Sequence, residues 1–378
     1  SIDIVEGNVA PSVILEAFQV VDTLQVDQVS GDVIVRAIVD DVNTSDSHSY
    51  NWSGTDNAIT EKDNGEVDNF VFDPQSLIPG YYTIRVTVSD GIETVTGELI
   101  LRVISEQPDL TVKDTDGDGI DDLSEGYGDD DQDGIVNYLD AIKADNVIQV
   151  LPTVFESYLM QVESGLKLTL GDIAFKAGYG GSLIDQADIV SYSSMSNVTA
   201  DEFENVGGYF DFTVTGLPVA GQSVLVVIPQ LVEMPRVPVY RKLTVNGWQN
   251  FVQDSRNSYS SAPGRPGHCP PPGDSSYQPG LKQGHWCLQL LIEDGGPNDN
   301  DGVANNKITD PGGIARVLSD VSVSSSGGGG GALGSIVSVL TVSIMLCLRR
   351  IRSRRRSMMA GSIRTRSRQK NCTEKITA

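Results

Sequence analysis

Carboxylate side chains recur at fixed intervals between residues 114 and 140. This stretch holds 11 acidic residues and no basic one, a density that repels itself unless cations neutralise it. Its first half fits the calcium-loop pattern D-x-D-x-D-G-x5-E without a mismatch. Calcium takes six to eight hard oxygen ligands at about 2.3–2.6 Å, and alternating carboxylates supply them. The expected ligands of this loop, which we call loop one, are Asp114, Asp116, Asp118, the backbone carbonyl of Ile120, Asp122 and Glu125.

A second copy of the pattern, loop two, follows almost at once and ends in Asp instead of Glu. Both loops have Gly at position six, where the chain must turn sharply, and Ile at position seven. A disordered acidic linker is the alternative interpretation, but it has no reason to repeat these two positions. We therefore expect about two calcium ions in this stretch. The expected ligands of loop two are Asp129, Asp131, Asp133, the backbone carbonyl of Ile135, Asn137 and Asp140.

A weaker metal pattern lies further along the chain. Asp299, Asp301 and Asn305 have the spacing of positions three, five and nine of a calcium loop. Position one of that loop falls on Pro297, which has no side-chain oxygen. The sequence leaves open whether this run binds a metal ion.

Two cysteines bracket a loop rich in Pro and Gly. For Cys269 and Cys287 we predict a disulfide, because an exported chain meets an oxidising compartment. A metal site that also uses His268 and His285 is the alternative. These residues lack the C-x2-C spacing of zinc sites, which favours the disulfide.

Charge and missing motifs exclude several function classes. The net charge is −24, yet 11 of the 27 basic residues and one of the 51 acidic ones lie in residues 349–378, so the rest of the chain carries −34. Such a body repels phosphate groups, so we expect no nucleic-acid partner. The sequence contains no H-E-x-x-H, G-x-S-x-G or G-x-x-x-x-G-K-[ST] motif. We therefore expect no enzyme activity in this segment.

Short runs of alternating apolar and polar residues indicate the elements that hold these loops. Between residues 8 and 104 they suit half-buried antiparallel strands separated by Gly, Pro and Asp turns, at the spacing of a β-sandwich. Further strands are expected around residues 209–215, 223–228 and 240–245, and Asn246-Gly247 predicts a hairpin turn. With 39 Gly and 17 Pro, the chain is predicted to be mainly β.

Three segments of the first hundred residues carry a family resemblance. They are residues 8–11 (Asn-Val-Ala-Pro), residues 50–52 (Tyr-Asn-Trp) and the run from Pro79-Gly80 to Asp90-Gly91. Together they resemble a PKD domain, which implies an immunoglobulin-like β-sandwich. An exposed Trp52 would suit stacking on a polysaccharide, but we expect Trp52 to fill the core of the sandwich.

The rest of the acidic body resembles two further families. The tandem loops are similar to bacterial thrombospondin type 3 repeats, which implies a connector wrapped around calcium. Residues 292–305, Asp310-Pro311-Gly312-Gly313, Gly247-Trp248 and residues 210–227 resemble the choice-of-anchor U domain. That resemblance implies a second β-rich domain beside a sorting signal.

The last residues indicate a membrane segment. Residues 332–348 form a 17-residue apolar run without a charge, and six of the next eight residues, 349–356, are Arg. Such a run spans roughly 25 Å as a helix, the short end of a transmembrane helix, and the arginines would hold its end in the cytoplasm. A buried core helix is the alternative, but only a basic, Ser-rich tail follows. Five glycines precede the run: Gly327, Gly328, Gly329, Gly330 and Gly331.

Glycines, apolar run and arginines in this order resemble the GlyGly-CTERM sorting signal of Gram-negative bacteria. The resemblance implies cleavage near the glycines by a rhombosortase-type intramembrane protease. It also implies export through a transient inner-membrane anchor to the cell surface or outer membrane, followed by retention or release. The 22 residues from Ser357 to Ala378 depart from the signal, which normally ends soon after its basic cluster.

The sequence thus predicts the anchoring and display region of an exported bacterial surface protein with a role in adhesion or binding. Its partners would be calcium, a membrane and a surface polysaccharide or protein. The alternative is the carrier and anchor region of a secreted hydrolase with its catalytic domain upstream. The expected parts are a PKD-like sandwich (1–106), a calcium-binding linker (107–145), a choice-of-anchor U-like β domain (146–322), a Ser/Gly spacer (323–331), a transmembrane segment (332–348) and a basic cytoplasmic tail (349–378).

Overall fold

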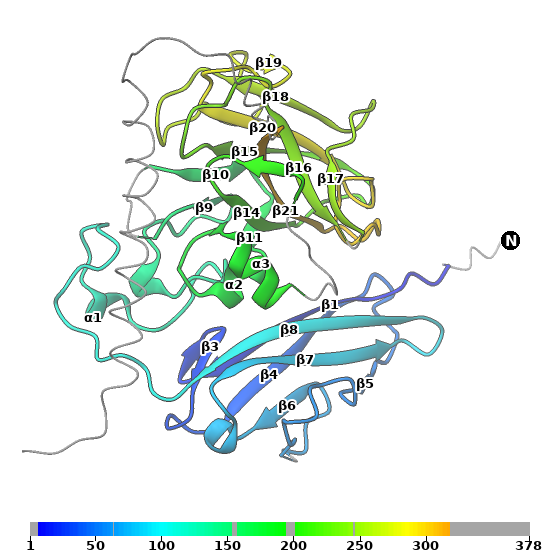
Figure 1. Ribbon diagram of the computed structural model, residues 1–378. Helices are drawn as coiled ribbons and strands as arrows, with labels where there is room; N and C mark the ends of the chain where they lie inside the picture. Colours follow the sequence, from blue (N-terminus) through cyan, green and yellow to red (C-terminus); the bar gives the residue numbers. More distant parts are fainter. Residues whose placement is uncertain (1–6, 63, 153–156, 194–200, 245, 318–378) are drawn as a thin grey trace, which may run out of the picture. The chain divides into compact units, whose positions relative to one another are not determined.

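The computed structural model describes residues 7–62, 64–152, 157–193, 201–244 and 246–317 (Figure 1). The chain divides into two compact units, residues 1–319 and residues 320–378. The second unit lies outside the described residues, and with it lie the predicted glycine cleavage site, transmembrane segment and basic tail. The described part of the chain is mainly β, as the sequence predicted.

The N-terminal β domain consists of two four-stranded sheets around one core. All described strand pairs within these sheets are antiparallel except β3 with β8, which run parallel. The first sheet has the order β2 (Val21–Asp22), β1 (Ser12–Gln19), β4 (Val33–Asp40), β6 (Asn69–Phe72), and the second has the order β3 (Gln25–Asp27), β8 (Thr94–Ile104), β7 (Gly80–Ser89), β5 (Ser49–Asn51). A short 3-10 turn, η1 (Pro74–Ser76), follows β6.

Alternating side chains explain these strands. On β7, Ile84, Val86 and Val88 are fully buried, and the residues between them are partly exposed. This is the period of two that the sequence showed, because successive side chains of a strand point to opposite faces. Trp52 packs in the same core and donates a hydrogen bond from its indole nitrogen to the carbonyl of Val67 at 3.1 Å. The prediction that Trp52 fills the core is confirmed.

Loops one and two occupy the stretch between β8 and β9. Its regular elements are α1 (Asp122–Glu125), at the end of loop one, and η2 (Asn137–Leu139), near the end of loop two. Ile135 of loop two belongs to the hydrophobic core of the domain that follows. Loop two therefore packs as part of that domain.

The second β domain, residues 147–317, is built from a six-stranded and a seven-stranded sheet that share one core. We call the six-stranded sheet C and the other sheet D. Sheet C has the order β19 (Gln278–Pro279), β18 (Ser258–Ala262), β20 (Cys287–Glu293), β15 (Ser223–Pro229), β10 (Leu159–Val162), β9 (Val147–Gln149). Sheet D has the order β11 (Lys167–Leu170), β14 (Tyr209–Thr215), β21 (Ile308–Val317), β16 (Val239–Thr244), β17 (Gly247–Asn250), with β12 (Leu183–Ile184) paired to β14 and β13 (Phe203–Asn205) paired to β21.

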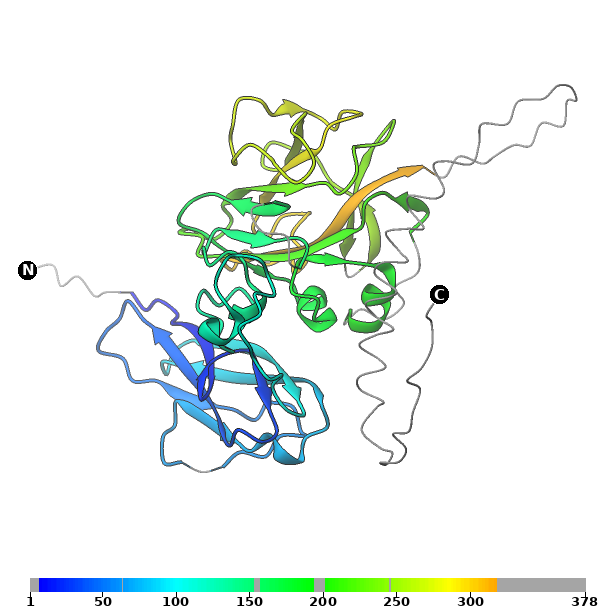
Figure 2. The same ribbon diagram turned by 90° about the vertical axis from the view of Figure 1, so that its left-hand side faces the viewer.

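Two short helices, α2 (Asp172–Ala177) and α3 (Gln186–Tyr192), lie side by side next to sheet D (Figures 1 and 2). The start of α2 is held by Asp211 of β14, whose Oδ2 accepts the amides of Ile173 at 2.7 Å and Ala174 at 2.9 Å. The α3 helix begins with a capping box formed by Asp185 and Asp188. These carboxylates satisfy amide groups that the first turn of a helix leaves without partners.

The disulfide predicted from the sequence is confirmed. Cys269 lies in the loop between β18 and β19, Cys287 begins β20, and their Cα atoms are 5.5 Å apart across the bond. The alternative metal site with His268 and His285 is thereby ruled out, because both thiols are used. Over the residues that the structure describes, no helix is both long and apolar enough to cross a membrane.

Candidate calcium sites

The two loops each bring three carboxylates together. One oxygen from each of Asp114, Asp116 and Asp118 lies within 4.8 Å of the other two. The corresponding oxygens of loop two, from Asp129, Asp131 and Asp133, meet the same limit. Two oxygens that both lie about 2.4 Å from one ion are at most about 4.8 Å apart. Each trio is therefore close enough to share a single calcium ion.

Positions one and six are joined in the same way in both loops. The amide of Gly119 donates to Asp114 Oδ2 at 3.1 Å, and the amide of Gly134 donates to Asp129 Oδ2 at 3.1 Å. Both glycines have φ of +95°, a conformation that side chains with a Cβ rarely adopt. The glycine at position six thus allows the loop to close on its first carboxylate.

Positions five and seven repeat a second contact. The amide of Ile120 donates to Asp118 Oδ1 at 2.7 Å, and the amide of Ile135 donates to Asp133 Oδ1 at 2.7 Å. Each position-five carboxylate thereby keeps its other oxygen for a different partner. A direct bond from the carbonyls of Ile120 and Ile135 to an ion stays a prediction.

In both loops the side chain at position nine accepts hydrogen bonds from the residue at position two. Asp122 accepts the amide of Thr115 at 2.7 Å and its hydroxyl at 2.6 Å, and Asn137 Oδ1 accepts the amide of Asp130 at 3.0 Å. The sequence predicted Asp122 and Asn137 as ligands. The structure gives both side chains a different contact, which holds the loop in its curved shape. Direct coordination by either residue stays a prediction.

Several carboxylate oxygens in the loops are buried and lack a hydrogen-bond partner. A buried polar atom without a partner costs free energy, so proteins keep such atoms few. Half of the buried unpaired side-chain atoms found among the described residues belong to these two loops. Buried carboxylate oxygens of this kind favour a positively charged partner. The atoms are Asp116 Oδ2, Glu125 Oε2, Asp131 Oδ1 and Oδ2, Asp133 Oδ2 and Asp140 Oδ2.

Burial and mutual repulsion shift the pKa values of these groups. Burial, with the charge of Asp131 added, raises the pKa of Asp129 to about 7 and that of Asp140 to about 8. Burial also raises the pKa of Glu125 to about 7, although Lys143 opposes the shift. The fully buried Asp133 is raised well above its usual value by burial and by the charges of Asp140, Asp131 and Asp129. Burial and neighbouring carboxylates disfavour the ionised form of each of these groups. A divalent cation nearby would stabilise that ionised form.

Two features of the site were not predicted from the sequence. Lys143 lies beyond the pattern, and its Nζ is 3.1 Å from Glu125 Oε1. Gln132 takes φ of +54° at position four, where loop one has Gly117 at +85°. The equivalence of the two positions was visible in the sequence, but only the backbone shows that both are left-handed. The spacing of the calcium-loop pattern gives no indication that Lys143 contacts Glu125.

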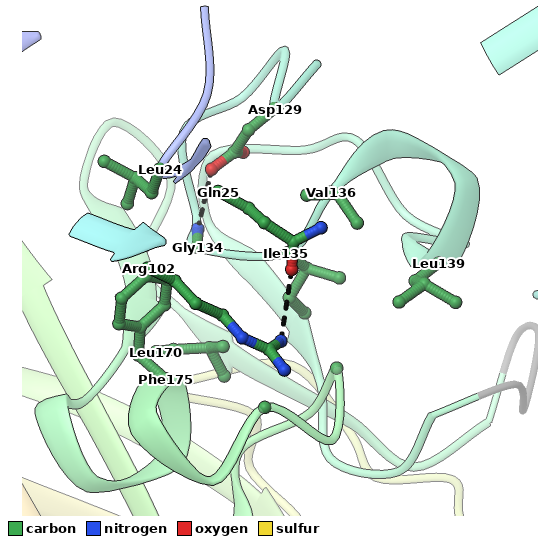
Figure 3. A pocket seen from close by; sticks show the side chains of 12 residues that line it. Leu24, Gln25, Arg102, Asp129, Gly134, Ile135, Val136, Leu139, Leu170 and Phe175 are labelled. Carbon is green, nitrogen blue, oxygen red and sulfur yellow. Dashed lines mark hydrogen bonds between the residues drawn. The ribbon is translucent and has the colours of Figure 1, made fainter. Parts of the chain in front are cut away.

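Loop two is tied to the chain on both sides. The amide of Asp129 donates to the carbonyl of Asp22 at 3.1 Å, and the amide of Leu170 donates to the carbonyl of Asp133 at 2.8 Å. Figure 3 shows Asp129 bonded to Gly134 beside a small pocket that Arg102 also lines. Residues from β8, loop two and α2 thus line the same pocket.

Another acidic group differs from the loops. Asp41, Asp46 and Asp90 also bring oxygens within 4.8 Å of one another. Asp41 Oδ2 is 2.8 Å from His48 Nε2, and Asp90 Oδ2 accepts from Asn8 at 3.0 Å. Asp41 Oδ2 and Asp90 Oδ2 are thus already paired, whereas loops one and two each contain buried carboxylate oxygens without a partner.

The acidic side chains near Pro297 form hydrogen bonds with nearby backbone and side-chain groups. Asp299 accepts the amides of Gly295 at 2.8 Å and Thr309 at 3.0 Å, and Asp301 accepts from Asn305 Nδ2 at 3.1 Å. Among the described residues, the acidic trios close enough for one ion do not include these side chains. The contacts favour a structural role for this run.

Comparisons with known proteins leave the chain without a family. No family model matches it, and no curated protein matches it. Three solved structures are similar to it at low identity: human protocadherin-24 EC1-2 (12% identity, TM-score 0.19, 60% of this chain and 90% of that one), a SusE-like surface-located polysaccharide-binding protein from the heparin utilisation locus of Bacteroides thetaiotaomicron (10%, 0.19, 67% and 42%), and surface layer protein SbsC, domains 4–9 (13%, 0.18, 84% and 52%). The chain spans about half the length of the second and third of these structures.

Proposed function

We propose that loops one and two bind calcium and stiffen the connection between the two β domains of an exported surface protein. The observation that carries this proposal is the set of buried carboxylate oxygens without partners in both loops. These oxygens would coordinate an ion in each trio. The charge of the ion would offset the repulsion that raises the pKa values of the carboxyl groups.

The contacts of loop two explain how an ion would act on the connection. The loop bonds to Asp22 at the end of β2 and to Leu170 at the end of β11. Without an ion, the charges of Asp129, Asp131 and Asp133 push the loop apart. With an ion the loop is rigid, and both hydrogen bonds are held at a fixed separation. Calcium therefore sets the stiffness of the junction.

The biological role follows from the whole chain. We infer a display and anchoring region with a binding or adhesion role, with a surface polysaccharide or protein as its partner. The acidic body disfavours nucleic acid. The surface location rests on the sequence pattern of residues 327–356, and mass spectrometry of the mature C-terminus tests it. A C-terminus near the five glycines supports sorting, and an intact Ala378 contradicts it.

Calorimetric titration of the full chain tests the calcium sites. We expect about two calcium ions per chain with affinities of about 10⁻⁴–10⁻³ M, the range of extracellular modules. Asp116→Asn and Asp131→Asn should each remove one ion. The matched control is Asp46→Asn, from the acidic group outside the loops, which should leave both ions bound. Unchanged binding in the Asp116→Asn, Asp131→Asn double variant would refute the proposal.

A further inference from the structure

A lysine and an aspartate meet in the core of the second β domain, away from the calcium loops. Lys242 lies on β16 and Asp310 on β21, which are neighbouring strands of sheet D. Lys242 Nζ is 2.7 Å from Asp310 Oδ1, and the two side chains are 1% and 0% exposed. The pair is therefore isolated from solvent.

A glycine makes room for this pair. Lys242 stands opposite Gly312 in the β16–β21 ladder. A Cβ on Gly312 would lie 2.7 Å from the hydroxyl of Tyr240 and 2.9 Å from Asp310 Oδ1. Any other residue at position 312 would thus collide with the Tyr240 hydroxyl, the Arg241 carbonyl and the Asp310 carboxyl.

If Lys242 and Asp310 are both charged, their hydrogen-bonding groups are incompletely paired. Asp310 Oδ2 is buried without a hydrogen-bond partner, and the second acceptor of the lysine is the carbonyl of Thr309 at 3.4 Å. A buried ion pair is stabilising only when its remaining donors and acceptors are also paired. Burial lowers the pKa of Lys242 and raises that of Asp310, so both groups are pushed toward their neutral forms. A neutral amine is a nucleophile, and a neutral carboxylic acid is an electrophile.

We propose that Lys242 and Asp310 condense to form an intramolecular amide bond. The lone pair of Nζ attacks Cγ of the carboxylic acid and forms the C–N bond. The Cγ–Oδ2 bond then breaks, and Oδ2 leaves as water with its own proton and one from Nζ. No electron is gained or lost, and no co-reactant is needed. The products are one amide and one water molecule.

The surrounding groups fit the product better than the reactants. Oδ1 becomes the amide oxygen and lies 3.4 Å from the hydroxyl of Tyr240, which donates to it as negative charge develops there in the tetrahedral intermediate. The remaining N–H faces the carbonyl of Thr309. The oxygen that departs is the one without a partner. Condensation therefore replaces two buried titratable groups with one neutral amide and removes the unpaired oxygen.

Peptide mass spectrometry of the full chain tests the bond directly. After reduction, alkylation and trypsin digestion, we expect a branched peptide that joins the segments around Lys242 and Asp310, lighter than their sum by one water. Trypsin should also fail to cut after Lys242. The exposed Lys307 is the matched control, and cutting after it should persist. Recovery of Lys242 with a free amine and Asp310 in a linear peptide would overturn the proposal.

Variants assign the chemistry. Lys242→Met and Asp310→Ala should each abolish the branched peptide. Tyr240→Phe keeps the ring in the core and removes only the donor, so the joined fraction should fall in freshly folded protein and rise on incubation. A branched peptide that survives Lys242→Met would contradict the assignment. Equal joining in Tyr240→Phe and the parent chain would remove Tyr240 from the mechanism.

Discussion

Loops one and two share their internal hydrogen bonds and differ in what surrounds them. Ile120 of loop one is 47% exposed, whereas the equivalent Ile135 of loop two is 2% exposed and belongs to the core of the second β domain. Asp114 is exposed, whereas its counterpart Asp129 is buried. The same pattern thus makes one loop whose first carboxylate and isoleucine face solvent and one whose equivalents are buried against a domain. The loss of an ion should therefore stay local in loop one and spread in loop two.

The largest effect should come from matched substitutions at position five in saturating calcium. At a free concentration 100 times the dissociation constant, a bound ion stabilises the folded state by about 2.7 kcal/mol. Asp133→Asn should lose this stabilisation in the second β domain, whereas Asp118→Asn should change that domain by about 0.5 kcal/mol or less. Hydrogen exchange of β11 and β14 measures it, with about 100-fold faster exchange expected for Asp133→Asn. Equal exchange rates in the two variants would contradict the claim that losing an ion affects the second β domain only through loop two.

Removing calcium should reverse the sign of the same substitution. Without an ion, Asp133 is a fully buried carboxyl among three others, and replacing it removes that repulsion. In a chelator, Asp133→Asn should therefore stabilise the second β domain by about 1 kcal/mol, the low end for replacing buried charge. Asp118→Asn serves as the control with little change. Thermal unfolding measures both, and a loss of stability in Asp133→Asn without calcium would contradict the apo repulsion.

The response to pH should sharpen the comparison further. Asp129 and Asp140 have folded pKa values of about 7 and about 8, above the value of about 3.9 in an unfolded chain. The calcium-free folded state therefore binds more protons than the unfolded state, and its stability falls as the pH rises from about 4 to 8. Added calcium should stabilise the chain more at pH 8 than at pH 5. Unfolding midpoints with and without calcium at both pH values measure this, and an equal gain would contradict it.

The smallest effect should come from position four. A left-handed conformation costs an L-residue about 1–2 kcal/mol, and Gly returns about 0.5–1 kcal/mol of that as extra entropy in the unfolded chain. Gln132→Gly should therefore stabilise loop two by roughly 0.5 kcal/mol, and the reverse change Gly117→Gln should destabilise loop one by a similar amount. Calcium affinity of each loop is the measurement. A weaker loop two in Gln132→Gly would show that Gln132 has a further contact.

Local patterns explain which features could be predicted from the sequence. The two loops are short, so spacing alone brought Asp114, Asp116 and Asp118 together, and alternation within a strand predicted the burial of Ile84 and its neighbours. Contacts between distant segments left no such signal. Lys143 reaches Glu125 through the fold, and Lys242 meets Asp310 only because β16 and β21 pair in one register. Such contacts depend on tertiary packing, which no local spacing records.

The position of β21 has a mechanical consequence. This ten-residue strand forms ladders with β14 and β13 on one side and with β16 on the other. A pull on the chain beyond Val317 would therefore load hydrogen bonds along both edges of the strand at once. Resistance to force is set by the rate of unfolding rather than by equilibrium stability. A strand paired on both edges has to break two ladders before it leaves its sheet.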